Sequence, residues 1–254
     1  MNITPPYAYS EIVPLNKEHR VLVPQARKIP PAFRPLNALP VSLIEFGPVS
    51  RDYPIVFITG DQGKSYVAMA VLGLEQGQNL FLHADSTWDR RVYLPAYVRR
   101  YPFCMATITV DGQQREERLV CVEKKAIKDK GDALFDDKGE PLPEWAQQQK
   151  LLVEYEADLQ RANELAATLA AAELLEPFSM QATPTQGQPI SMTGMFRVNE
   201  QKLVALDAAK LQAMMQRGFL ARIYAHLMSL DNFQRLLDRR AASSFAPKAA
   251  PAAK

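Results

Sequence analysis

The sequence contains little glycine and no excess of charge of either sign. Only 11 of its 254 residues are Gly, whereas 19 are Pro. Because phosphate-binding loops depend on the backbone freedom of glycine, this balance disfavours a nucleotide-binding protein. The 30 Lys and Arg residues nearly balance the 28 Asp and Glu residues. A net charge of +2 argues against a dedicated nucleic-acid binder, which needs an excess of cations to displace counterions from phosphates.

Long apolar runs are also missing. The best candidate, residues 66–74, is closed by Glu75 and falls well short of the roughly 18 apolar residues that a membrane-spanning helix needs. Residues 1–20 hold three prolines and four charged side chains, without the apolar segment of a secretory signal. We therefore expect a cytoplasmic protein with no transmembrane segment, and leave export by another route open.

The chain has two cysteines, Cys104 and Cys121, in segments that we interpret as strands. Buried free thiols in strands are common in reducing compartments, so we expect free cysteines, with a disulfide as the alternative. The signatures of serine nucleophiles, Cys-x-x-Cys zinc ligands and calcium loops are missing from the sequence. We therefore predict no cofactor and favour a protein that is not an enzyme.

The N-terminal half of the chain is rich in strand signals. Residues 1–40 hold eight prolines, which predict an extended segment because each proline restricts the residue before it. Residues 41–125 contain short runs rich in β-branched and aromatic residues, typical of a mostly antiparallel sheet of about six strands. The strands are expected at 41–46, 55–59, 66–74, 79–83, 103–110 and 119–123, with turns at 60–63 and 111–112.

From Pro143 onwards, the spacing of the apolar residues is that of a helix and no longer that of strands. Apolar residues recur every three, four or seven positions, which predicts a long helix over residues 143–176 with its carboxylates on the solvent face. Extended structure is expected again over residues 184–206, with a strand at 192–198.

A second helical block is predicted over residues 207–240, with Asp207 as its N-cap and Gly218 as a break between helices. Residues 241–254, mainly Ala, Pro, Ser and Lys, are expected to be a disordered tail. The sequence therefore predicts a single α+β domain over residues 41–240, in which a β-rich half packs with a long helix and a C-terminal helical block.

Two of the three histidines suggest a metal site. His83 and Asp85 have the His-x-Asp spacing of an iron-oxygenase ligand set, and His226 would be the third ligand. A metal-dependent modifying enzyme is therefore the alternative function. Because His226 lies within a predicted helix rather than on a barrel strand, a structural or solvated histidine is the favoured interpretation.

Residues 88–103, which we call the Arg/aromatic segment, pack four arginines among five aromatic residues. Guanidinium groups bind carboxylates and phosphates through paired hydrogen bonds and stack on aromatic rings. The alternative is a loop whose rings lie in the core and whose arginines pair with internal acids. The candidate residues for binding a ligand or partner are Trp88, Arg90, Arg91, Tyr93, Tyr97, Arg99, Arg100 and Tyr101.

The same segment carries a family resemblance. The run Tyr-Leu-Pro-Ala-Tyr-Val-Arg-Arg-Tyr-Pro-Phe at 93–103, read with residues 53–57, 79–81 and 225–230, resembles the bacterial SapC family over nearly the whole chain. The resemblance implies an association with paracrystalline surface layers and supplies no catalytic residues to carry over. We therefore expect a soluble accessory protein that binds a ligand, a protein or a peptide, and no nucleic acid.

Overall fold

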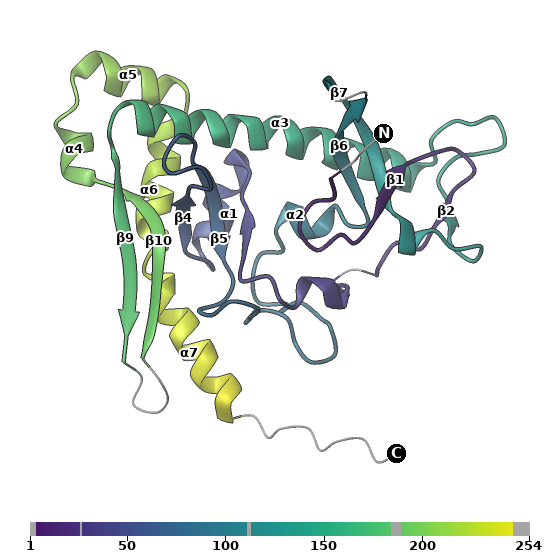
Figure 1. Cartoon of the computed structure of the whole chain (residues 1–254), viewed down its shortest axis with the longest axis horizontal. Helices are drawn as coiled ribbons and strands as arrows, with labels where there is room; N and C mark the ends of the chain where they lie inside the picture. The colour runs from purple at the N-terminus through teal and green to yellow at the C-terminus, as the bar shows by residue number, and fades with distance from the viewer. Residues whose placement is uncertain (1–3, 26, 111–112, 184–188, 246–254) are drawn as a thin grey trace.

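The computed structural model describes residues 4–25, 27–110, 113–183 and 189–245. Over these residues the chain forms three antiparallel sheets, one long helix and a C-terminal block of helices (Figure 1). The predicted α+β class is confirmed. Within the described residues, none of the helices is long and apolar enough to cross a membrane.

The largest sheet combines strands from both halves of the chain. The predicted strands at 55–59, 66–74 and 192–198 are confirmed within it, and residues 60–63 form the connection between two of them. The C-terminal strands therefore complete a sheet that the N-terminal half begins. In spatial order the strands are β3 (Ala38–Pro40), β5 (Val67–Val71), β4 (Ile55–Ile58), β10 (Ile190–Val198) and β9 (Leu175–Ala182).

Two predicted strands are wrong. Residues 41–46 lead instead into the 3-10 helix η2 (Leu43–Glu45) and the short helix α1 (Phe46–Ser50). Glu45 accepts hydrogen bonds from the amide and the hydroxyl of Ser42, a capping box that starts a helical turn. Residues 79–83 form only an isolated bridge, from Leu82 to Trp88. Most apolar side chains of both runs are buried, although Ile44 is exposed, and short apolar runs do not distinguish strands from other buried structures.

The second sheet has the order β1 (Ile12–Pro14), β7 (Gln113–Glu123) and β6 (Phe103–Val110). Its register places Cys104 directly opposite Cys121, and both are buried free thiols, as predicted. The predicted turn at 111–112 lies outside the described residues. A third, two-stranded sheet pairs β2 (Arg20–Val21) with β8 (Asp132–Ala133).

The long helix α3 (Pro143–Ala171) runs along one side of the molecule and contacts both larger sheets (Figure 1). Trp145 and Leu152 in its first half belong to the apolar cluster beside β6 and β7, whereas Leu165 and Leu169 belong to the main core. The helix ends earlier than the predicted residue 176. Glu173 adopts a left-handed conformation with a φ of 54°, and β9 then begins at Leu175.

The C-terminal block confirms the predicted N-cap Asp207 and the predicted break at Gly218, whose φ is 71°. The extended structure predicted over 184–206 is wrong at its end, because Asn199 caps a short helix by accepting from the Lys202 amide at 2.9 Å. Residues 184–188 lie outside the described residues. The helices are α4 (Glu200–Val204), α5 (Ala208–Gln216), α6 (Phe219–Ser229) and α7 (Asn232–Phe245).

The expected tail begins later than residue 241, because α7 continues as a helix to Phe245. Residues 246–254 lie outside the described residues. At the other end of the chain, the described part of residues 1–40 contains only β1, β2, β3 and the 3-10 helix η1 (Pro31–Phe33). Two further short helices are α2 (Ala96–Arg99) and η3 (Lys124–Ala126).

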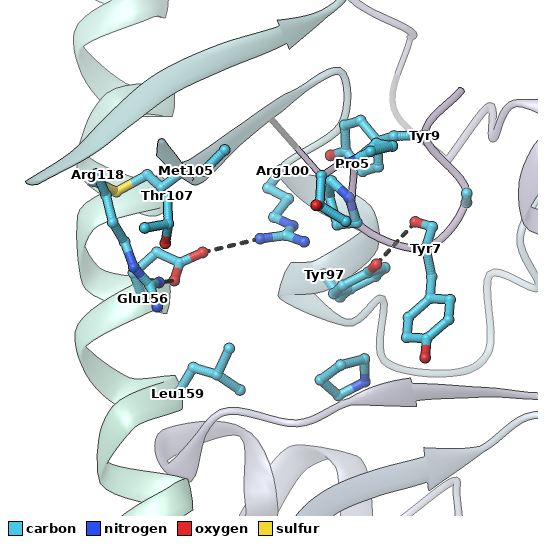
Figure 2. Close-up of a pocket in the computed structure, with 15 residues that line it drawn as sticks. Pro5, Tyr7, Tyr9, Tyr97, Arg100, Met105, Thr107, Arg118, Glu156 and Leu159 are labelled. Atoms are coloured by element: carbon cyan, nitrogen blue, oxygen red, sulfur yellow. Dashed lines mark hydrogen bonds and ion pairs between the residues drawn. The ribbon is translucent and has the colours of Figure 1, made fainter. Parts of the chain in front are cut away.

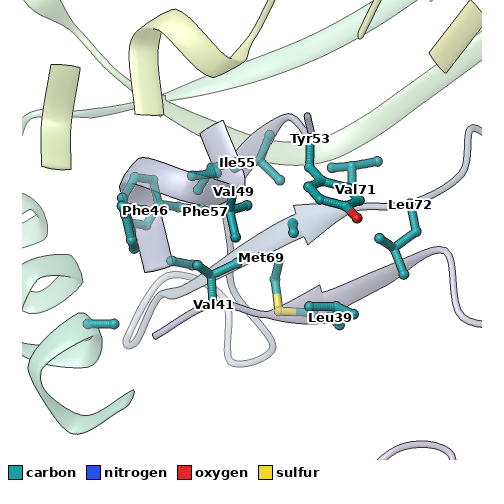
Figure 3. Close-up of a cluster of buried hydrophobic side chains, with 14 of the residues drawn as sticks. Leu39, Val41, Phe46, Val49, Tyr53, Ile55, Phe57, Met69, Val71 and Leu72 are labelled. Carbon is teal, nitrogen blue, oxygen red and sulfur yellow. The ribbon is translucent and has the colours of Figure 1, made fainter. Parts of the chain in front are cut away.

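The main core lies between the five-stranded sheet and helices α1, α3 and α6. Figure 3 shows its centre, where side chains of α1 meet those of β4, β5 and the segment before η2. Burial of these apolar side chains is the dominant favourable contribution to folding. The fully or almost fully buried residues in this view include Leu39, Val41, Phe46, Val49, Ile55, Phe57, Val71 and Leu72.

Candidate functional site

The first part of the Arg/aromatic segment faces solvent. Arg90 is exposed and forms no hydrogen bond or ion pair with the residues that the structure describes. Arg91 is also exposed, but its Nη2 donates to Asp89 Oδ2 at 2.9 Å. Arg239 of α7 donates to the same carboxylate at 2.9 Å. Hydrogen bonds from Arg91 and Arg239 hold the pKa of Asp89 well below its usual range. Asp89 therefore ties the segment to α7 through Arg239, and Arg91 pairs with the same carboxylate.

Internal partners satisfy Trp88 at the start of the segment and Tyr93 and Arg99 in its middle. Trp88 is fully buried, and its Nε1 donates to the Tyr53 hydroxyl at 3.0 Å. The hydroxyl of Tyr93 donates to the buried carboxylate of Glu45 at 3.0 Å. Arg99 lies over the Tyr93 ring and donates to its hydroxyl at 3.0 Å. Packing and pairing within the fold therefore account for these side chains.

Arg100 differs from the other three arginines because it is buried, with only 4% of the residue exposed. Its Nη1 donates to Glu156 Oε1 at 3.1 Å, and Arg118 of β7 donates to the other oxygen of the same carboxylate (Figure 2). The guanidinium carbon lies 4.3 Å from the centroid of the Tyr97 ring and 5.0 Å from that of Tyr155. Arg100 is therefore enclosed by aromatic rings and shares one carboxylate with a second arginine.

This cluster lines a cavity of about 850 Å³, a size within the range of pockets for small molecules. Five parts of the chain form its walls: residues 4–9, Pro40, the end of the Arg/aromatic segment, the β6–β7 pair and α3 (Figure 2). The apolar walls come from prolines, Met105 and Leu159. The cavity thus combines apolar surface with a small number of oriented polar groups, as ligand sites do.

Residues 4–9, which we call the N-terminal strap, cover one side of the cavity. The Tyr97 hydroxyl donates to the carbonyl of Tyr7 at 2.8 Å, and the Tyr9 hydroxyl donates to the carbonyl of Phe103 at 2.7 Å. Both bonds join residues that are at least 90 positions apart in the sequence. They fix the strap against the Arg/aromatic segment.

Among the described residues, two buried polar atoms beside the cavity have no hydrogen-bond partner, namely Nε of Arg100 and the hydroxyl of the neighbouring Tyr155. Such groups are rare in folded proteins because leaving a buried donor unpaired costs about 1–3 kcal/mol. Burial raises the pKa of Tyr97 to about 12 and raises that of Tyr155 further, so both phenols stay neutral. Burial also raises the pKa of Glu156, although both guanidiniums oppose this.

Tyr101, the remaining candidate of the segment, is half-buried. Its ring packs edge-on against Phe33 at 5.6 Å between centroids and lies 5.2 Å from the ring of Tyr9. Tyr101 therefore helps to position Tyr9 of the strap and does not line the cavity itself.

The predicted position of the helix carboxylates is wrong at Glu156. This residue is buried, whereas the sequence pattern was interpreted as placing the carboxylates of α3 on the solvent face. Its spacing of four from Leu152 and three from Leu159 puts it on the apolar stripe, and this signal could have identified it. Arg118 and Tyr9 carry no comparable signal, because only the folded chain brings them to Arg100.

The structure does not bring the three candidate metal ligands together. His226 is fully buried, where its Nδ1 donates to the Ile55 carbonyl at 2.8 Å and its Nε2 accepts from the Val198 amide at 3.1 Å. Both ring nitrogens are therefore engaged. His83 and Asp85 are exposed. Within the described residues, no group of three or more His, Cys, Asp or Glu side chains could hold a metal ion.

A model of the SapC family matches residues 15–236, which is most of the chain. The matched range includes Arg100, Arg118 and Glu156 and begins after the N-terminal strap. No curated protein and no solved structure matches the chain.

Proposed function

The chain belongs to the SapC family, and we propose that it is a non-catalytic accessory protein that binds a ligand in the cavity around Arg100. The observation that carries the proposal is the buried guanidinium of Arg100, which tyrosines enclose at the wall of a cavity of about 850 Å³ and whose Nε has no partner in the part of the chain that the structure describes. A buried charge that serves folding alone is normally paired at each of its polar atoms.

Buried charged groups elsewhere in the protein support this distinction. Glu45 accepts hydrogen bonds from Ser42, Tyr93 and the amide of Ala96, and no cavity adjoins it among those described. Asp89 is likewise engaged by two arginines. The cluster of Arg100, Arg118 and Glu156 is set apart because it adjoins open space.

The chemistry of the cavity favours binding over catalysis. Both oxygens of Glu156 are occupied by guanidiniums, which leaves this carboxylate poorly placed to accept a proton from a substrate. Burial raises the pKa values of Tyr9 and Tyr97 at the wall and of the neighbouring Tyr155, so all three phenols stay protonated near neutral pH. Oriented donors and apolar walls, without an activated nucleophile or base, are features of a binding site.

The biological setting rests on the sequence and the family. We propose a ligand that is not a nucleic acid, because the net charge is only +2. A protein or peptide partner, a cytoplasmic location and an association with surface layers stay predictions for this chain. Cell fractionation tests the last two, since a protein found only in the cytosol does not take part in a surface array.

A cavity-filling variant tests the proposal. Leu159 lines the cavity from α3, and Val153, on the same helix, is 53% exposed. We expect compounds from a panel of small carboxylic acids, amides and amines to raise the melting temperature of the wild type and of Val153→Trp. Leu159→Trp, which fills the cavity, should lose this response, and Thr107→Trp, which fills it from β6, should lose it as well.

The proposal is wrong if no compound stabilises the wild type. It is also wrong if the compounds stabilise both cavity-filling variants as strongly as they stabilise Val153→Trp, since the ligand would then bind elsewhere.

A further inference from the structure

The charges around the cavity indicate which chemical class of ligand it takes. We infer that the ligand carries one carboxylate on an apolar body, with the carboxylate bound by Arg100 and Arg118. This inference rests on the proposed function and specifies the ligand of the same site.

The cavity cluster carries one positive charge in excess. Arg100 and Arg118 are both charged, because an arginine side chain does not deprotonate in proteins, and they share the single carboxylate of Glu156. The surrounding tyrosines are neutral at physiological pH. A monoanion would therefore balance the charge of the site.

Two other buried carboxylates, those of Glu123 and Glu45, are occupied by their own donors. Glu123 accepts from the amide of Ser10 at 2.8 Å and from its hydroxyl at 2.6 Å. Glu45 accepts from four donors and lies 3.9 Å from the exposed Arg99. Neither of them forms a hydrogen bond with Arg100 or Arg118 among the described contacts. The excess positive charge therefore belongs to the cavity.

The two guanidiniums still have donors to offer. Arg100 uses only Nη1 toward Glu156, and Arg118 also uses only Nη1. The side chain of Arg118 is 39% exposed, which leaves it room to bind a second acceptor. A carboxylate matches the planar fork of a guanidinium with two parallel hydrogen bonds. A ligand carboxylate can thus share the two arginines, as Glu156 already does.

The walls indicate the rest of the ligand. Pro5, Pro6 and Pro40 face the same space as Met105 and Leu159, and the ring of Tyr97 adds an aromatic surface (Figure 2). Such walls favour an alkyl chain or an aromatic ring over a sugar or a nucleotide. A phosphate is a poorer match, because a dianion would exceed the single positive charge of the site.

A free carboxylic acid and the C-terminal carboxylate of a peptide both offer this chemistry. The experiment therefore has three arms on the full chain, all read by isothermal titration calorimetry. The first arm compares phenylbutyrate with phenylbutanamide, and the second compares it with phenylbutylamine. Both keep the apolar body and change the charge of the polar group. The third arm compares acetyl-Leu-Leu-Phe with its C-terminal amide.

We expect phenylbutyrate to bind, and the neutral amide and the amine to bind at least about tenfold more weakly. Arg118→Met should weaken the binding of phenylbutyrate about tenfold and leave that of the amide unchanged. Arg90→Met is the matched control, because Arg90 is exposed and does not line the cavity, and it should change neither affinity. Stronger binding by the peptide acid than by phenylbutyrate assigns the carboxylate to a peptide, and weaker binding assigns it to a small acid.

The inference is overturned if the amide or the amine binds as tightly as the acid, and this outcome leaves the cavity as a binding site. It is also overturned if neither acid binds at millimolar concentration while other compounds still respond to Leu159→Trp. The absence of any binding in both experiments instead overturns the proposed function itself.

Discussion

The sheet core and the surroundings of the cavity both bury polar side chains, but the described residues pair them differently: His226, Ser229 and Asn232 in the core are hydrogen-bonded, whereas two polar atoms beside the cavity are not. In the core, the Ser229 hydroxyl accepts from the Ile55 amide at 2.8 Å and donates to the His226 carbonyl at 2.6 Å. Asn232 donates to the carbonyls of Ser50 and Tyr53. At the cavity, Nε of Arg100 and the hydroxyl of Tyr155 have no partner. We infer that buried polar groups with hydrogen-bond partners stabilise the fold, whereas buried polar groups without partners belong to a binding site.

The two regions also differ in how they are built. The sheet core joins α1, α6 and α7 to β4 and β10 through close packing, so its polar groups sit among elements that hold one another in place. The cavity lies where the N-terminal strap, α2, the β6–β7 pair and α3 meet. We therefore expect substitutions in paired groups to change the free energy of unfolding, and substitutions in the cavity cluster to change ligand affinity.

The largest loss of stability is expected for Asp89→Ala. The buried carboxylate of Asp89 accepts charge-assisted hydrogen bonds from Arg239, whose side chain is 24% exposed, and from the exposed Arg91, and their loss costs about 2–4 kcal/mol after screening at Arg91. Urea unfolding measures this cost, and calorimetry should show an unchanged affinity for phenylbutyrate. A cost below about 1 kcal/mol would mean that such a paired group does not hold the fold.

The next effect is a pH dependence that originates in the sheet core. Burial lowers the pKa of His226 from 6.5 to about 4, so the unfolded chain binds a proton in this range that the folded chain does not. The resulting stability is present above pH 6.5 and is lost as the pH falls toward 4. The loss is on the order of 3 kcal/mol.

His226→Gln provides the comparison for this pH dependence. The free energy of unfolding of the wild type should fall more steeply between pH 6.5 and 4 than that of His226→Gln. Carboxyl groups titrate in both proteins, and the difference between the two curves isolates the histidine. Parallel curves would show that His226 is not buried in its neutral form.

Two tyrosines offer a matched pair across the two regions. Tyr53 accepts from Trp88 Nε1 at 3.0 Å and donates to the carbonyl of Tyr93, whereas the hydroxyl of Tyr155 has no partner. Tyr53→Phe should lower the free energy of unfolding by about 1–3 kcal/mol, because it leaves the buried Trp88 donor unpaired. Tyr155→Phe should leave the stability unchanged or raise it. Equal losses in the two variants would contradict the distinction between paired and unpaired groups.

The smallest effect is expected at Arg90. Although it lies in the Arg/aromatic segment, it is exposed and has no partner among the described residues. Arg90→Ala should change the free energy of unfolding by less than about 0.5 kcal/mol and leave ligand affinity unchanged. A marked loss of binding would move the recognition surface from the cavity to the exposed part of the segment.

Local patterns in the sequence were sufficient to predict much of the fold. The predictions of a strand over 103–110 and of a helix from Pro143 rest on the regular spacing of hydrophobic residues, and both are confirmed. The run 41–46 was predicted wrongly because its apolar residues are buried by packing rather than by strand pairing. A capping box formed by Ser42 and Glu45 starts a 3-10 helix there instead of a strand.

The candidate site could be predicted only in part. The Arg/aromatic segment contains Arg100 and Tyr97, yet nothing in its composition distinguishes Arg100 from Arg91, which pairs with an acid two residues away. The distinction depends on Glu156 and Arg118, which are contributed by α3 and β7. Contacts between segments so far apart follow from sheet register and helix docking, which local sequence patterns do not specify.

Methionine-methyl NMR tests most directly whether the ligand binds in the cavity around Arg100. Met105 lines this cavity, Met214 lines a second cavity of about 330 Å³, and Met228 is 73% exposed on α6. On titration with phenylbutyrate, the methyl resonance of Met105 should shift and saturate, while those of Met214 and Met228 stay in place. A resonance of Met105 that does not move while that of Met214 or Met228 shifts would contradict the account.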